Sequence, residues 1–100
     1  MHTIRQETEF GTELIIFTTQ EALERRDVWQ AYRVTCADFD YDHATDKRQP
    51  PTARVSLMSA TRADAALTRQ LAAEYTAVAD AAEALQAEKR AAYAERFGGE

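Results

Sequence analysis

The last third of the chain is the feature that most restricts how the protein can fold. Residues 62–97 contain neither Gly nor Pro, and 14 of these 36 residues are Ala, which has the highest helix propensity. Thr61 with Asp64 three residues later suits a helix N-cap, and Gly98 suits a stop. One helix of this length would measure about 54 Å, whereas a compact chain of 100 residues has a radius of gyration of about 13 Å. We therefore expect helix 62–97 either to break or to extend beyond the body.

The first 18 residues have the pattern of a β-hairpin. Apolar and polar residues alternate over 3–10, and 13–18 is an apolar run, as in a half-buried strand followed by a central one. Gly11-Thr12 between them suits a two-residue type II′ turn. The alternative is one bent strand with a bulge at Gly11.

The middle of the chain can be interpreted as helix or strand. Thr18 and Glu21 have the spacing of a capping box, which predicts a helix to about Trp29. Apolar residues at three- and four-residue intervals would allow this helix to continue to about residue 42. Strand-forming residues and strict alternation favour instead a strand over about 32–41.

The remaining segment predicts a loop and one more strand. Pro50-Pro51 marks a loop over 43–52, and 55–59 is a short strand candidate that would pair back across it. The expected order is ββαββα. The sequence thus predicts a single α+β domain over 1–100, with a small antiparallel sheet covered by the first half of a long Ala-rich C-terminal helix.

Projected as a helix, the last segment carries an apolar stripe interrupted by charges. Two antiparallel copies with a twofold axis between Ala81 and Ala82 would place Glu74 opposite Lys89. Upstream of about Val78 we expect the stripe to cover the sheet, and beyond Leu85 to contact a partner; the alternative is a bent helix that packs entirely within its own chain. The predicted partner-binding face comprises Leu71, Glu74, Val78, Ala82, Leu85, Lys89 and Ala92.

A second candidate surface is acidic. On a strand, Asp38, Asp40 and Asp42 would lie on one side at intervals of about 6.6–6.8 Å. Such an acidic row could dock on a basic groove made for nucleic acid. The simpler interpretation is an edge strand whose charges prevent aggregation.

The sequence offers little catalytic or metal-binding chemistry. With Asp46 the aspartates match part of a calcium-loop spacing, but His43 stands where Gly is needed and Gln49 where a bidentate Glu is needed. Cys36 is the single cysteine and has no charged neighbour to activate it. We expect no catalytic residue, no metal and no cofactor.

The aromatic residues gather in the middle of the chain. Trp29, Tyr32, Phe39 and Tyr41 lie within thirteen positions. Such a cluster is usually core, but an exposed Trp29 would make it an interface anchor, because Trp and Tyr dominate binding hot spots.

Composition narrows the class of function. The net charge of −5 argues against direct binding of nucleic acid, and no apolar run is long enough to cross a membrane, so we expect a cytoplasmic protein. Ten Arg against two Lys, with 20 Ala, is typical of a GC-rich bacterial or phage genome. The sequence predicts a non-enzymatic regulatory or adaptor protein that binds another protein, with a homodimer favoured. The alternative is an acidic inhibitor, of the kind phages encode, that docks on the basic groove of a nucleic-acid-binding complex.

Overall fold

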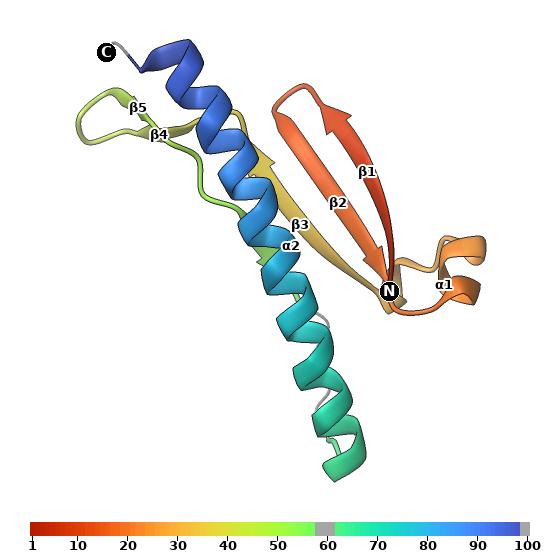
Figure 1. The fold of residues 1–100 in the computed structure, drawn as a ribbon. Coiled ribbons are helices and arrows are strands. Elements are labelled where there is room, and N and C mark those ends of the chain that lie inside the picture. The colour runs from red at the N-terminus through yellow and green to blue at the C-terminus, as the bar shows by residue number, and fades with distance from the viewer. Residues whose placement is uncertain (58–61, 99–100) are drawn as a thin grey trace.

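A computed structural model shows an antiparallel sheet with one long helix packed across it (Figure 1). The structure describes residues 1–57 and 62–98. The predicted α+β class, with a small antiparallel sheet and a long C-terminal helix, is confirmed. In chain order the elements are β1 (His2–Thr8), β2 (Gly11–Phe17), α1 (Gln20–Arg25), the 3₁₀ turn η1 (Val28–Gln30), β3 (Ala31–Ala37), β4 (Asp40–Asp42), β5 (Lys47–Gln49), β6 (Arg54–Ser56) and α2 (Ala65–Phe97).

The main sheet has the order β1-β2-β3-β6, with antiparallel neighbours throughout. In the register of β2 and β3, Leu14 lies opposite Val34 and Ile16 opposite Tyr32. Because side chains alternate along a strand, these four point to one face, and all four are buried. This face receives α2.

The predicted hairpin is confirmed, but its turn was placed two residues too late. Glu9 and Phe10 form the turn, and Thr8 stabilises it by accepting a hydrogen bond from the Phe10 amide and donating one to the Gly11 carbonyl. Gly11 is instead the first residue of β2 and has φ of 150°. A Cβ there would lie 2.3 Å from the Cys36 carbonyl oxygen, so the glycine permits a close backbone approach rather than a turn.

The helix between β2 and β3 is shorter than predicted, since it ends at Arg25 and not near Trp29. Thr19, not Thr18, is the N-cap, and its side chain accepts from the Ala22 amide at 3.0 Å. The helix α1 ends at Arg25 because Arg26 takes a left-handed conformation with φ of 53°. The long-helix alternative is therefore wrong.

The predicted strand 32–41 is present, but it is divided into two. β3 ends at Ala37, and β4 begins at Asp40 and pairs with β5 in a separate hairpin. Residues 47–49 of the predicted loop are thus a strand. β6 pairs with β3 as expected, with Val55 opposite Val34, while the end of the predicted strand 55–59 lies outside the described residues.

Helix α2 runs without a break over 33 residues, about 50 Å, which equals the longest dimension of the molecule, 50 Å. It begins after Asp64, whose carboxylate accepts from the Leu67 amide at 2.8 Å; the predicted cap Thr61 lies outside the described residues. The radius of gyration of 15.9 Å exceeds the value of about 13 Å for a compact chain of this length. The helix therefore extends past the sheet.

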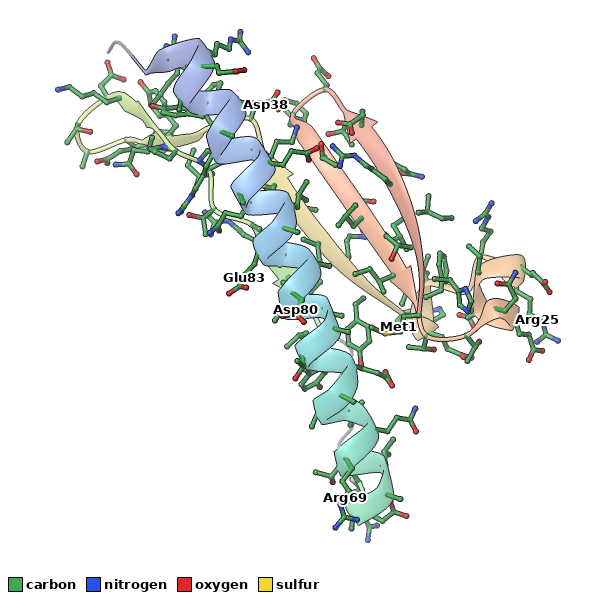
Figure 2. All side chains as sticks on the ribbon, viewed as in Figure 1. Met1, Arg25, Asp38, Arg69, Asp80 and Glu83 are labelled. Atoms are coloured by element: carbon green, nitrogen blue, oxygen red, sulfur yellow. The ribbon has the colours of Figure 1, made fainter. Side chains whose placement is uncertain are left out.

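The overhang is at the opposite end of α2 from the one predicted. The N-terminal turns extend beyond the sheet, and Arg69 lies far from any strand (Figures 1 and 2). Burial is instead concentrated from Val78 to Leu85. The expectation that the upstream half covers the sheet holds only for its last turns: Tyr75 packs edge to face on Tyr32 and Val78 is buried, whereas the turns around Arg69 lie beyond the strands.

We expect Gly11→Ala to lower the free energy of unfolding by about 2 kcal/mol or more, since the added Cβ meets the Cys36 carbonyl and φ is strained. Urea denaturation followed by circular dichroism measures this loss. Glu9→Ala in the adjacent turn is the control and should change stability little. Equal stability of Gly11→Ala and wild type would contradict the close approach of β2 and β3.

Candidate functional site

The predicted partner-binding stripe of α2 is the face that packs on the chain's own sheet. Val78 is 0% exposed and Leu85 is 3% exposed. Together with Ala82 they form one core with residues of β2 and β3: Leu14, Ile16, Tyr32, Val34 and Cys36. Leu85, which the sequence assigned to the partner-binding face, therefore packs on the sheet of its own chain.

The charges within that stripe also have partners in the same chain. Glu74 accepts a hydrogen bond from the Tyr32 hydroxyl at 2.8 Å, and Lys89 donates to Asp38 at 3.0 Å. The Lys89 side chain is only 13% exposed and lies 4.0 Å from Glu7 of β1. The sequence predicted that Glu74 would pair with Lys89 of a second copy. In the structure Glu74 is instead bonded to Tyr32, and Lys89 is paired with Asp38 of its own chain.

The two ends of the stripe are less engaged. Leu71 is half-buried and Ala92 is exposed. A role for the whole stripe in binding a partner stays a prediction, and it would require the contacts of Val78, Leu85 and Lys89 with the sheet to open.

A polar network fixes the C-terminal half of α2 to the β1–β2 hairpin. Arg5 donates to Glu88 of α2 at 2.9 Å and to Glu7 at 2.8 Å, and the Thr12 hydroxyl donates to Glu7 at 2.6 Å. The Thr12 hydroxyl and the Arg5 guanidinium lower the pKa of Glu7, so this carboxylate stays ionised as a link between strand and helix.

The predicted acidic row is held mainly by groups of its own chain. Asp38, which precedes β4, pairs with Lys89. Asp40 accepts from the Thr52 amide at 3.1 Å and lies 3.5 Å from Arg54. These contacts reduce the negative potential that would attract a basic groove.

The third member of the row, Asp42, organises the β4–β5 turn. Its carboxylate accepts from the Ala44 amide, the Thr45 hydroxyl and the Gln49 side chain at 2.9 to 3.1 Å. The Thr45 hydroxyl and then the Ala44 amide lower the pKa of Asp42. The Asp42 carboxylate oxygens therefore stabilise the β4–β5 turn by accepting these three hydrogen bonds.

The sheet face opposite α2 is open except at the end of β2, where Phe17 belongs to this face and is 1% exposed. The other side chains of this face come from alternate residues of each strand and include Ile4, Glu13, Ile15, Ala31, Arg33, Thr35, Arg54 and Ser56. Glu13 and Arg33 approach to 3.7 Å across β2 and β3. We call this surface the open face; sequence analysis did not single it out.

An exposed tryptophan lies at one end of the open face. Trp29 is 88% exposed, and Val28 and Leu57 beside it are more than half exposed. They border a hollow of about 550 Å³ whose floor includes Ile15 and Ala31. Large apolar side chains gathered in the open usually mark an interaction site.

The local structure holds Trp29 in this exposed position. The Asp27 carboxylate caps the turn η1 by accepting from the Trp29 amide at 3.1 Å and from the Gln30 side chain at 3.2 Å. Tyr32, three residues later, is fully buried against α2. The predicted aromatic cluster is thus divided, with Tyr32 in the core and Trp29 at the surface.

A second exposed aromatic lies at the other end of the sheet. Phe10, in the β1–β2 turn, is 78% exposed. It borders a smaller hollow of about 230 Å³ together with Glu13, Thr35 and Arg54 of the open face. The open face is therefore flanked by apolar groups at both ends of its strands.

The β4–β5 hairpin forms a cleft of about 1300 Å³ with the C-terminal end of α2. The Arg48 guanidinium lies 4.5 Å from the centre of the Phe97 ring and 5.6 Å from that of Phe39, and these rings meet edge to face. Arg90 donates to the Pro51 carbonyl at 2.8 Å. These contacts fasten the hairpin to the helix.

Two observations on residues 1–57 and 62–98 bear on catalytic and metal chemistry. In this part of the chain no three His, Cys, Asp or Glu side chains converge as metal ligands. Cys36 is buried, and burial raises the pKa of its thiol, which disfavours a nucleophilic thiolate. No helix over the same residues is both long and apolar enough to cross a bilayer.

Comparisons with known proteins add no functional information. None of the protein-family models, curated proteins or solved structures compared with this chain matches it.

We expect Tyr32→Phe to lower the free energy of unfolding by about 1.5–3 kcal/mol, because it removes a hydrogen bond to a carboxylate. Burial and the bond to Glu74 raise the pKa of Tyr32. The unfolded chain loses this proton near pH 10 while the folded chain keeps it, so stability should fall as the pH rises above about 10.

Urea unfolding at successive alkaline pH values measures this dependence. Tyr32→Phe should make the fall in stability shallower, whereas the control Tyr93→Phe, in a half-buried position near the end of α2, should leave the Tyr32 contribution in place. An unchanged pH dependence in Tyr32→Phe would contradict the buried hydroxyl.

Reversing the charge of Lys89 should also destabilise the fold. Lys89→Glu places three carboxylates together, with those of Asp38 and Glu7, and we expect a loss on the order of 1 kcal/mol. The exchange Asp38→Lys with Lys89→Asp should recover most of it. Thermal unfolding at several protein concentrations measures both; a loss that depended on concentration would favour the Glu74–Lys89 pairing between copies.

Proposed function

We propose that this chain is a non-enzymatic regulatory or adaptor protein that acts by binding another protein chain, and that the binding surface is the open face of the sheet around Trp29. The observation that carries the proposal is the exposure of Trp29, 88%, beside Val28 and Leu57 at a hollow of about 550 Å³. We also place the protein in the cytoplasm, as its sequence suggests.

Physical reasoning supports this surface over the helix stripe. Leaving a Trp, a Val and a Leu side by side in water forgoes the stabilisation of about 1.5–3 kcal/mol that burial of each such side chain provides. Trp is among the residues that contribute most to binding when an interface buries it. Asp27 holds the Trp29 backbone in place before any partner arrives, so little backbone conformational entropy is lost on binding.

The acidic inhibitor remains a second candidate with less support. It would need Asp38, Asp40 and Asp42 to present unneutralised charge, but Lys89 lies 3.0 Å from Asp38 and Arg54 lies 3.5 Å from Asp40. Docking through this row would have to separate those ion pairs. The open face needs no such rearrangement.

Site-specific photo-crosslinking tests the proposed function. A photoreactive amino acid at position 28, next to Trp29, should yield a covalent adduct with a protein chain when the variant is expressed in bacterial cells. The same amino acid at position 87, on the exposed side of α2, is the matched control and should yield none.

Adding Trp29→Ser to the position 28 variant should abolish the adduct while the circular dichroism spectrum stays unchanged. The absence of any adduct at position 28, or equal adducts at positions 28 and 87, would contradict binding through the open face.

A further inference from the structure

We propose that the open face binds a second copy of this chain, giving a homodimer in which two sheets pack face to face with α2 on the outside of each. This inference rests on the proposed function and names the partner. Three properties of the open face carry it: the arrangement of its aromatic ends, the arrangement of its charges and its neutrality.

The two exposed aromatic groups are placed symmetrically along the strands. Trp29 precedes Ala31, and Phe10 precedes Gly11, which pairs with Ala37. Between these ends β3 spans six residue steps, about 20 Å, and the level of Val34 is midway. A twofold axis parallel to the sheet and perpendicular to β3 at this level would place the Trp29 end of each copy over the Phe10 end of the other.

This geometry brings unlike aromatic surfaces together twice. Rotation about this axis keeps each strand over its counterpart, so Phe10 of the other copy would lie at the β2 side of the hollow beside Trp29, which is about 550 Å³ and includes Ile15 of β2 in its lining. An isologous dimer requires such self-complementarity, since each patch must match another patch of the same surface. The two ends of the open face meet this requirement.

The charges obey the same symmetry. Relative to the level of Leu14 and Val34, Glu13 lies one residue to one side in β2, and Arg33 lies one residue to the other side in β3. Rotation about the axis places Arg33 of one copy and Glu13 of the other at the same level on neighbouring strands. Each intrachain pair at 3.7 Å would thus become part of a four-charge network.

Neutrality distinguishes the open face from the chain as a whole. The protein has a net charge of −5, so two copies repel each other over most of their surface. On the open face Arg33 is balanced by Glu13, and at its edge Arg54 is balanced by Asp40. Two copies can approach here without net repulsion, whereas a strongly charged partner would find no complementary field.

The area of the open face limits the affinity expected for the dimer. The seven-residue strands β1, β2 and β3, spaced about 4.8 Å apart over about 20 Å, and the three-residue β6 give a flat footprint of about 330 Å², below the roughly 800 Å² per partner of a standard interface. The exposed side chains of Trp29, Phe10, Val28 and Leu57 must supply the remainder. We therefore expect a dimer in the micromolar range.

Two measurements on the purified full chain test the dimer. Sedimentation equilibrium from low to high micromolar concentration should show the average mass rise from one copy to two. Trp29 is the only tryptophan, so its fluorescence should shift to shorter wavelength over the same concentrations as the ring leaves water. A chain that stays monomeric with constant emission overturns the proposal.

Substitutions at the two ends should have matching effects. Trp29→Ser should weaken the dimer about 30-fold or more, and Phe10→Ser, at the far end of the strands, should also weaken it. Ala87→Ser on the exposed side of α2 is the control and should leave the mass distribution unchanged. A dimer insensitive to both end substitutions overturns the proposed face.

A charge-exchange experiment isolates the contact between copies. In Glu13→Arg and in Arg33→Glu the residues at positions 13 and 33 that meet across the interface carry like charges, so each variant alone should dimerise more weakly than wild type. When the two variants are mixed, opposite charges meet at both contacts across the interface and the heterodimer should form in preference to either homodimer. No preference for the heterodimer overturns the proposed pairing.

Failure of the dimer can be told apart from failure of the proposed function. A monomeric purified chain that still forms position 28 adducts with a different protein in cells would overturn the homodimer alone. A monomeric chain without any adduct would overturn both.

Discussion

The packing of three side chains of β3 against the middle of α2 is the contact on which the rest of the structure depends. Tyr32, Val34 and Cys36 alternate along the strand and are almost wholly buried, and Val78 and Leu85 meet them from the helix. The core is small, as expected for a chain of 100 residues. Its position decides which helix residues are unavailable to a partner and which sheet face stays open.

Polar contacts complete the docking of α2 because the helix stripe is not purely apolar. Glu74 and Lys89 interrupt it, and a buried or half-buried charge is unfavourable unless it is paired. The Tyr32 hydroxyl donates a hydrogen bond to Glu74, and Lys89 donates one to Asp38. The charges that break the stripe therefore fix the position of the helix along the sheet, and they would resist its separation.

A sheet covered on one side by a single helix has a second side to account for. Here it carries two ion pairs in place of a continuous apolar layer, which lets the sheet face water, but its two ends carry Trp29 and Phe10. This combination of a polar, neutral centre with apolar ends is what a surface needs if it is to be stable alone and still bind. The proposals that the open face binds a protein and that this protein is a second copy of the chain both follow from this combination.

The sequence by itself determined the elements that depend on local chemistry. Alternation predicted the hairpin and β3, and the run of Ala without Gly or Pro predicted α2. It misplaced the first turn because Gly11 permits both a turn and a close approach, and only the position of the Cys36 carbonyl distinguishes them. The β4–β5 hairpin was missed because its strands are three residues long and depend on Asp42 contacts across the turn.

Only the tertiary structure decided which end of α2 overhangs, what Glu74 and Lys89 contact, and that Trp29 is exposed while Tyr32 is buried. The physical reason is that periodicity gives a residue its face on an element but not the element's position along its neighbour. That position is set by side chains from distant parts of the chain, and they meet only after folding.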